Sequence, residues 1–238
     1  MREEIETLKR WIEESRAIAF FGGAGVSTES GIPDFRSVDG LYSKKYDYPP
    51  ETIVSRSFFL SKPEEFYRFF REKVMIEGVV PNKAHVRLAE LEKEGKLTGI
   101  VTQNIDGLHQ KAGSVNVLEF HGSAERYFCI ACGKKHDVSE VRSGTGAPHC
   151  ECGGLIRPDV VLYEEPIDDK VAAGAVKLMR EADMLIVGGT SLVVYPAAGL
   201  INYYGGKRLV IINKAATSFD SQADLVIDEK IGEVFGQV

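Results

Sequence analysis

Short apolar runs alternate with amphipathic stretches over most of the chain. Ile5, Leu8 and Ile12 recur at the spacing of one helix face, which predicts a helix over residues 3–15. Apolar runs of strand length follow, and helical periodicity separates several of them. The predicted strands cover residues 17–21, 98–102, 115–120, 182–188, 208–213 and 224–227. Strands that alternate with helices predict an α/β fold, in which a parallel sheet carries helices on both faces.

Polar residues gather directly after these predicted strands. They occupy residues 22–27, 103–106, 121, 189–191 and 213–214. The carboxyl ends of the strands of an open parallel sheet form its ligand crevice, so we expect these five segments to converge there.

A long stretch after the first strand has a different character. Residues 33–57 are rich in Pro, Asp, Tyr and Ser and show weak periodicity, which predicts a long loop. Loops of this length inside a compact domain are often functional. Residues 58–76 and 81–91 regain the periodicity of helices.

The composition argues against some classes of protein. Among 238 residues, 29 basic and 35 acidic side chains leave a net charge of −6. An acidic chain is a poor general binder of nucleic acid, so we expect no specific nucleic-acid partner. No apolar run approaches the roughly 20 residues of a membrane span, and the charged first residues lack a signal peptide's apolar core. We therefore expect a cytoplasmic protein with no membrane partner.

The glycine-rich turn after the first strand is compatible with nucleotide binding. Gly23 and Gly25 would let the backbone approach a diphosphate closely. The usual dinucleotide fingerprint has a third glycine where this chain has Thr28, so a purely structural turn stays an alternative. Phe35 and Arg36, a few residues on, suit contact with a ring and pairing with phosphate, although alone they indicate a core aromatic and a surface arginine.

Two further strand ends carry candidate chemistry. Gln103, Asn104 and Asp106 could hydrogen-bond a carboxamide or a ribose, since such groups are costly to bury unpaired. Asp106 could instead cap a helix. His121 is a candidate general base near neutral pH, although a lone histidine is more often structural.

The four cysteines form two close pairs. Cys129 and Cys132 are separated by two residues, and Cys150 and Cys152 by one. In a chain without signs of export, this pattern favours one zinc ion over disulfides or free thiols. Four thiolates leave no open position, so the zinc would be structural, and His149 is a possible substitute ligand.

Together these segments resemble the sirtuin (Sir2) family of NAD-dependent protein deacylases, in its compact prokaryotic form. The resemblance runs in order through residues 23–27, 31–36, 102–106, 121–122, the four cysteines, 189–192 and 212–213. It implies a Rossmann-like sheet and a small domain built from a helical insertion and a zinc module. The implied Rossmann-like part covers residues 1–34, 82–121 and 159–238, the helical insertion 35–81 and the zinc module 122–158.

The resemblance also implies roles for individual residues. His121 would be the general base, and Asn104, with Gln103, would position the nicotinamide ribose as a second catalytic residue. The implied NAD contacts are Gly23, Ala24, Gly25, Thr28, Phe35, Arg36, Gln103, Asn104, Ile105, Asp106, His121, Gly189, Thr190, Ser191, Asn213 and Ile231. The implied contacts with the substrate peptide, by strand addition, are Val160, Val161, Leu162 and Tyr163.

The implied reaction removes an acyl group from lysine. The acyl oxygen attacks C1′ of the nicotinamide ribose, nicotinamide leaves, and His121 activates a ribose hydroxyl that attacks the resulting alkylamidate. Acetyl-lysine would give lysine, nicotinamide and O-acetyl-ADP-ribose. Sirtuins selective for succinyl or malonyl groups carry Tyr-x-x-Arg, whereas Lys45 follows Tyr42 here, so we predict acetyl or another uncharged acyl group. The family's Phe-Gly pair is Tyr163 and Glu164 here, which leaves the path of this loop open.

Three alternatives remain at this point. One is mono-ADP-ribosyl transfer on the same scaffold, and another is a zinc-ribbon module that binds protein or nucleic acid. The third is an NAD dehydrogenase, against which the incomplete glycine fingerprint argues. We expect a monomer that acts on acetylated-lysine proteins.

Overall fold

The structure is a computed structural model, which describes residues 2–34, 40 and 46–238. Phe35 and Arg36, predicted to contact NAD, lie outside the described residues. So do Tyr42 and Lys45, on which the predicted acyl preference rests.

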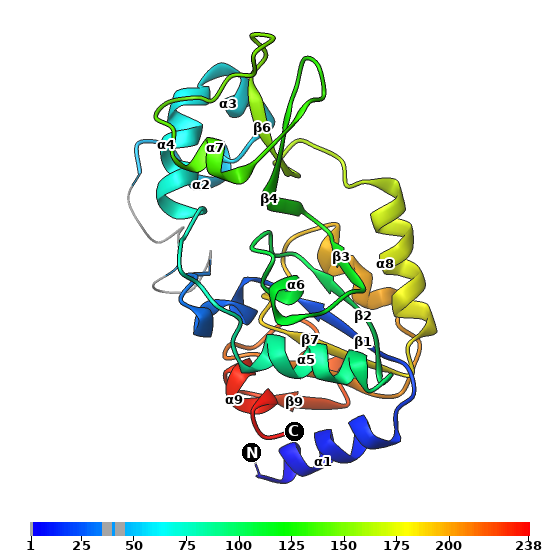
Figure 1. The fold of residues 1–238 in the computed structure, drawn as a ribbon. Helices are drawn as coiled ribbons and strands as arrows, with labels where there is room; N and C mark the ends of the chain where they lie inside the picture. The colour runs from blue at the N-terminus through cyan, green and yellow to red at the C-terminus, as the bar shows by residue number, and fades with distance from the viewer. Residues whose placement is uncertain (1, 35–39, 41–45) are drawn as a thin grey trace.

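The larger part of the described chain is built on a parallel sheet of six strands, in the order β3-β2-β1-β7-β8-β9 (Figure 1). The strands are β1 (Ile18–Gly22), β2 (Leu97–Thr102), β3 (Val117–Glu119), β7 (Met184–Gly188), β8 (Leu209–Ile212) and β9 (Leu225–Ile227). Each overlaps one of the predicted apolar runs. The predicted parallel sheet is therefore confirmed, and its strand order reverses between β1 and β7, where open sheets of this kind bind ligands.

Different segments cover the two faces of this sheet, because side chains alternate along each strand. Phe20 of β1 lies in a hydrophobic cluster with α1, α5 and α9, whereas its neighbour Phe21 lies in a second cluster with α8 and η4. These are α1 (Arg2–Glu14), α5 (Lys83–Lys93), α8 (Asp169–Glu181), α9 (Ile231–Phe235) and the 3-10 segment η4 (Ala197–Tyr203). Both faces are thus buried, as predicted. No helix within the described ranges has both the length and the apolar character needed to cross a membrane.

A second, antiparallel sheet lies above the large one in Figure 1, in the order β5-β4-β6. A third hydrophobic cluster, which includes Phe59, Phe66 and Tyr127, packs this sheet against several short helices. The elements are β4 (Gly122–Cys129), β5 (Lys135–His136), β6 (Ile156–Val160), α2 (Pro50–Ile53), α3 (Arg56–Ser61), α4 (Pro63–Lys73) and α7 (Val138–Arg142). Two separate stretches of sequence therefore share one core. The exact division into two domains stays a prediction.

The single helix predicted over residues 58–76 is wrong. The chain forms α3 and α4 instead, and Lys62 between them has φ −137° and ψ 57°. Pro63 explains the break, because proline has no N–H for a helical hydrogen bond and disfavours the helical conformation of the preceding residue.

Candidate active site and metal centre

The polar segments predicted to converge do lie at one edge of the large sheet. Gly22, the last residue of β1, pairs with Thr102 at the end of β2 and with Gly188 at the end of β7. Thr102 pairs in turn with Glu119, and Gly188 with Ile212. Because the register aligns these carboxyl ends, the loops that follow them start side by side.

The glycine-rich turn packs directly on the loop after β7. The Gly25 N–H donates a 2.8 Å hydrogen bond to the Gly189 carbonyl. A Cβ atom at Gly25 would lie 2.7 Å from Gly189 Cα, and one at Gly23 would lie 2.8 Å from Thr190 Cβ. Close backbone contact therefore requires both glycines, as the structural alternative held. The turn continues through two short 3-10 segments, η1 (Ala24–Val26) and η2 (Thr28–Ser30), and Thr28 is exposed.

A buried hydroxyl joins two of the predicted site residues. Ser27 donates a 2.6 Å hydrogen bond to Asp106 Oδ2, and it accepts one of 3.0 Å from Asn104 Nδ2. The other oxygen of Asp106 accepts the Leu108 N–H at 2.9 Å, at the start of α6 (Leu108–Ala112). The N-cap residue of α6 is Gly107, so the alternative that Asp106 is the N-cap is wrong, although Asp106 accepts the first N–H of the helix. Sequence analysis placed Ser27 in the polar segment after the first strand but assigned it no role of its own.

A second set of hydrogen bonds joins the loops after β2, β7 and β8. Gln103 Nε2 donates to Thr190 Oγ1 at 2.9 Å. Asn213 accepts the Thr190 N–H at 3.1 Å and donates to the Thr190 carbonyl at 2.6 Å. Three predicted site residues from distant parts of the sequence are therefore fixed relative to one another, and Ser191 beside them is exposed.

His121 lies at the same edge, where the two sheets meet. Its Nδ1 lies 3.1 Å from the Gln103 carbonyl, and because a carbonyl can only accept, Nδ1 carries the proton and Nε2 is the basic nitrogen. Burial lowers the pKa of His121, and the hydrogen bond to Gln103 offsets this only in part. The imidazole is therefore neutral at pH 7, as a general base must be.

Gly122 explains how the chain turns from this histidine into the small sheet. Its φ is 76°, and a Cβ atom there would lie 2.1 Å from the Asp159 carbonyl oxygen. The His121 carbonyl accepts a 3.0 Å hydrogen bond from the Val161 N–H. The predicted peptide-binding segment thus runs directly beside the predicted base.

Some predicted contact residues have side chains that belong to the core. Ile231 is 3% exposed, and a Cβ atom at Gly188 would lie 2.2 Å from its Cδ1 atom. Leu162 is 2% exposed, whereas Tyr163 is 40% exposed. Any contact of Leu162 with a peptide would therefore use its backbone, and the NAD contact implied for Ile231 stays a prediction.

Two histidines that were not predicted to belong to the site contact each other near Asp106. His85 and His109 are buried, with ring centroids 4.7 Å apart. Burial lowers the pKa of His85 to about 4, although the charge of Asp106 acts in the opposite direction. Burial, together with His85, lowers the pKa of His109 to about 3. Both imidazoles are therefore neutral near pH 7.

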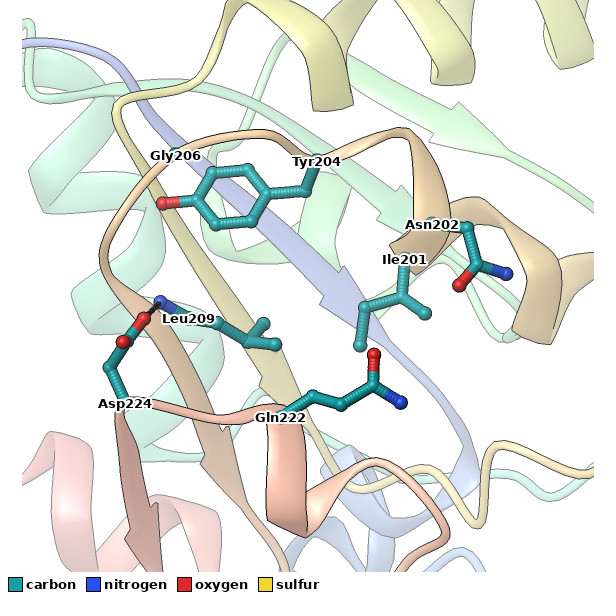
Figure 2. Close-up of a pocket in the computed structure, with 7 residues that line it drawn as sticks. All are labelled: Ile201, Asn202, Tyr204, Gly206, Leu209, Gln222 and Asp224. Atoms are coloured by element: carbon teal, nitrogen blue, oxygen red, sulfur yellow. Dashed lines mark hydrogen bonds between the residues drawn. The ribbon is translucent and has the colours of Figure 1, made fainter.

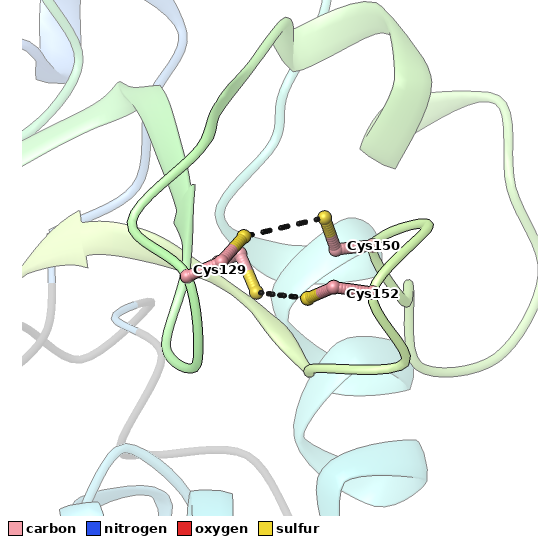
Figure 3. Close-up of side chains that lie close together, drawn as sticks. Cys129, Cys150 and Cys152 are labelled. Atoms are coloured by element: carbon pink, nitrogen blue, oxygen red, sulfur yellow. Dashed lines mark hydrogen bonds between the residues drawn. The ribbon is translucent and has the colours of Figure 1, made fainter.

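The four cysteine sulfurs form one cluster where the end of β4 and the loop after it meet the loop before β6. Figure 3 labels Cys129, Cys150 and Cys152 of this cluster. The Cys129 and Cys152 sulfurs are 3.5 Å apart, those of Cys132 and Cys150 are 3.7 Å apart, and all four lie within 4.8 Å of one another. Zn–S bonds of about 2.3 Å in a tetrahedron separate the sulfurs by about 3.8 Å, whereas a disulfide needs about 2 Å. The four cysteines are therefore positioned to bind one zinc ion.

Local backbone geometry explains the unusually close second pair. Gly153 has φ 82°, and a Cβ atom at Gly154 would lie 2.6 Å from Cys129 Sγ. Backbone N–H groups of Cys132 and Ala131 lower the pKa of the Cys129 thiol to about 6, which favours the metal-binding thiolate. His149 Nδ1 lies 2.9 Å from the Ala147 carbonyl, and the cluster of ligand atoms does not include it.

A hollow of about 280 Å³ lies elsewhere on the molecule, between η4 and the starts of β8 and β9 (Figure 2). Its lining includes Leu209, the first residue of β8, whose N–H donates to Asp224 at 2.8 Å. In a parallel sheet the starts of the strands lie at the edge opposite their ends. This hollow is therefore separate from the edge that carries His121.

Comparison with known proteins agrees with this geometry. The Sir2 family matches residues 23–196 of the chain. The chain belongs to the Sir2 family. It is 56% identical to an NAD-dependent protein deacetylase of Clostridium acetobutylicum, over 99% of this chain and 98% of that protein. It is 57% identical to a protein of the same description from Clostridium perfringens, over 100% of this chain and 99% of the other. The family predicted from the motifs is therefore confirmed.

Solved Sir2 structures share this fold. A Sir2 protein with a deacetylated p53 peptide and 3′-O-acetyl ADP ribose matches with a TM-score of 0.91 and 40% identity, over 98% of this chain and 96% of that one. A Sir2 complex with a p53 peptide and NAD+ matches with a TM-score of 0.87 and 41% identity, over the same shares of the two chains. The α/β fold class is thereby confirmed.

Proposed function

We propose that this Sir2 protein is an NAD-dependent protein lysine deacetylase that produces lysine, nicotinamide and O-acetyl-ADP-ribose. Relatives at more than half identity over the whole chain carry this description, and Sir2 structures hold NAD+, acetylated peptide and O-acetyl-ADP-ribose. The observation in this chain that supports it is the neutral His121, placed with Asn104 and Asp106 along the edge where the strands end.

The residues at this edge fit a dinucleotide. The faces of Gly23 and Gly25 that lack a Cβ atom pack against the loop after β7, so the binding of a diphosphate at this turn stays a prediction from the family resemblance. Each carboxylate oxygen of Asp106 has a second lone pair beside the hydrogen bond it already accepts, so it can receive a carboxamide N–H. When bound, NAD supplies a ribose carbon from which nicotinamide can be displaced.

The chain's own contribution is to orient groups and move one proton. His121 accepts the proton of a hydroxyl at Nε2 while the Gln103 carbonyl holds Nδ1. Ser27 fixes Asn104 and Asp106 relative to each other, so that both face the same substrate groups. The roles of Phe35 and Arg36 at the nicotinamide and phosphates, and of Thr28, Ser191 and Ile231 along the dinucleotide, stay predictions.

Acetylated-lysine proteins are the proposed substrates, because Sir2 relatives have been solved with acetylated peptides. A peptide would add as a strand beside residues 160–163. We also propose that the zinc is structural, that the chain is monomeric and that it acts in the cytoplasm. Size-exclusion chromatography tests the second of these proposals and cell fractionation the third.

The decisive experiment measures nicotinamide release from NAD with an acetyl-lysine peptide, with the unacetylated peptide and with no peptide. Release that depends on the acetyl group, with O-acetyl-ADP-ribose detected by mass spectrometry, supports the proposal. ADP-ribosylated peptide with the acetyl group retained would support the alternative, mono-ADP-ribosyl transfer. A succinylated peptide in parallel tests acyl preference, and we expect slower turnover of it.

A further inference from the structure

Glu164, which follows the predicted peptide-binding segment, has an unusual backbone conformation. Its φ is 76°, in the left-handed region that glycine adopts freely and other residues rarely do. Among the non-glycine residues that the structure describes, Leu192, with φ 54°, is the other in this region. A glutamate kept in such a conformation calls for compensating contacts in the folded protein.

Those contacts come from α3 on the neighbouring insertion. Glu164 Oε2 accepts the Ser57 N–H at 2.9 Å, and Oε1 accepts the Ser57 hydroxyl at 2.8 Å. The N–H of Ser57 belongs to the first turn of α3, where amides have no acceptor within the helix. The carboxylate therefore supplies a partner that the helix lacks, and it ties the loop to the helix at two points.

The backbone reinforces this contact one residue earlier. The Tyr163 N–H donates to the Val54 carbonyl at 3.1 Å, and the Arg56 N–H donates to the Tyr163 carbonyl at the same distance. Residues 54–57 and 163–164 thus form a short parallel bridge with a side-chain clamp at its end.

The following residue, Glu165, fixes the loop from its other side. Two Arg157 nitrogens donate to its carboxylate at 2.7 and 2.8 Å, and the Leu162 N–H donates at 2.9 Å. Burial would raise the pKa of Glu165, but these bonds outweigh it and hold the pKa below its ordinary value. Glu165 is therefore a fixed anchor, whereas Glu164 is exposed and makes the contact that the left-handed backbone permits.

We propose that Glu164 is a positioning residue that fixes the backbone of residues 160–163 for the substrate peptide. This inference rests on the proposed function, since it concerns the acetylated peptide. The same segment is hydrogen-bonded through Val161 to the His121 carbonyl, which holds its first half in place independently of Glu164. A segment that is already ordered loses less conformational freedom when a peptide binds, so the clamp acts on peptide affinity.

Three variants separate the parts of the clamp. Glu164→Ala removes the carboxylate and keeps a side chain in the left-handed conformation, Glu164→Gly also relieves that conformation, and Ser57→Ala removes the hydroxyl alone. We expect the KM for an acetyl-lysine peptide to rise about tenfold in Glu164→Ala and about threefold in Ser57→Ala, with Glu164→Gly between them. The kcat and the KM for NAD should stay within about twofold of those of the unaltered protein, because Glu164 and Ser57 are not expected to contact NAD or the reacting atoms.

Two further measurements test the clamp more directly: the combined effect of the Ser57 and Glu164 substitutions, and amide exchange in the peptide-binding segment. The double variant Ser57→Ala/Glu164→Ala should be no worse than Glu164→Ala, because the two side chains act as one contact. Amide exchange at residues 161–163 should accelerate in Glu164→Ala. Glu181→Ala, an exposed glutamate at the end of α8, is the matched control and should change none of these values.

An unchanged peptide KM in Glu164→Ala would overturn the inference. So would faster amide exchange without a change in KM, which would make the clamp purely structural, or a fall in kcat with KM unchanged. If the unaltered protein does not turn over the acetylated peptide, the proposed function is contradicted. The differences between the variants test only the role of Glu164.

Discussion

Two regions of this molecule are ordered by different kinds of interaction. The loops at the carboxyl edge of the large sheet are fixed by hydrogen bonds among Ser27, Asp106, Gln103, Thr190 and Asn213, above strands that are buried on both faces. The cysteine loops are ordered by backbone hydrogen bonds, such as that from the Cys150 N–H to the Gly154 carbonyl at 2.8 Å, and the side chains of Cys132 and Cys152 are exposed. We therefore expect the first region to stay folded without the metal and the second to need the ion to hold its loops together.

Removal of zinc should therefore produce the largest difference between the two regions, because it should disorder only the cysteine loops. In Cys150→Ser the ion loses one of four ligands, so we expect loss of zinc and deacetylation below about one hundredth of the normal rate. Amides of β4 and β6 should exchange quickly, while those of β1 and β7 stay protected. Metal analysis and hydrogen exchange check both halves.

His149→Ala is the matched control for this experiment, since His149 lies next to a ligand but outside the sulfur cluster. It should keep one zinc ion and normal activity. Loss of zinc in His149→Ala, or full protection of β4 in Cys150→Ser, would contradict the contrast between the regions.

Replacement of the predicted base, His121, should leave both regions folded. His121→Ala removes the imidazole whose Nε2 is free to accept a proton, so deacetylation should fall about a thousandfold. Circular dichroism and zinc content should be unchanged. Activity within about tenfold of normal would remove His121 from the role of base.

The sequence predicted the parts of this site that lie next to strands, and missed those that depend on pairing across the fold. Strand ends can be located from apolar runs, so His121 and Asp106 were placed correctly at one edge. Ser27 became meaningful only once β1 and β2 were adjacent, because its two partners are more than seventy residues away. The contact between His85 and His109 and the clamp at Glu164 arise in the same way, from long-range packing that local periodicity does not encode.

Other misses had local signals. Pro63 marks the break between α3 and α4, and Gly153 marks the tight turn of the second cysteine pair. Both follow from the backbone properties of proline and glycine.

Loss of the buried Ser27 hydroxyl should lower activity with NAD without unfolding the loops at the carboxyl ends of the large sheet's strands. Ser27→Ala leaves Asp106 and Asn104 without their shared partner, so we expect kcat/KM for NAD to fall about tenfold. Steady-state kinetics measure this effect. Ser143→Ala, which removes an exposed hydroxyl at the end of α7, is the control and should be neutral. An unchanged kcat/KM in Ser27→Ala would show that Asp106 is positioned by the Leu108 N–H alone.

Acid should destabilise the large sheet through the two buried histidines. Their pKa values are about 4 and about 3 in the folded protein, against about 6.5 in an unfolded chain. Between these values the unfolded chain binds protons that the folded protein does not, so the free energy of unfolding falls as pH decreases below about 6.5. Each imidazole contributes up to about 1.4 kcal/mol per pH unit.

His109→Leu removes one of the two imidazoles, so it should reduce their joint contribution to this dependence by about half between pH 6.5 and 5, while the contribution of His121, whose pKa burial also lowers, remains. Urea unfolding followed by circular dichroism measures it. Zinc binding also weakens in acid, so the variant and the unaltered protein are compared at each pH, which cancels that contribution. His149→Ala, which replaces an exposed histidine outside this pair, is the control variant. If the free energy of unfolding depends on pH equally in His109→Leu and in the unaltered protein, His109 takes up its proton before the sheet unfolds. The surroundings of His85 and His109 would then be more open to water than their packing indicates.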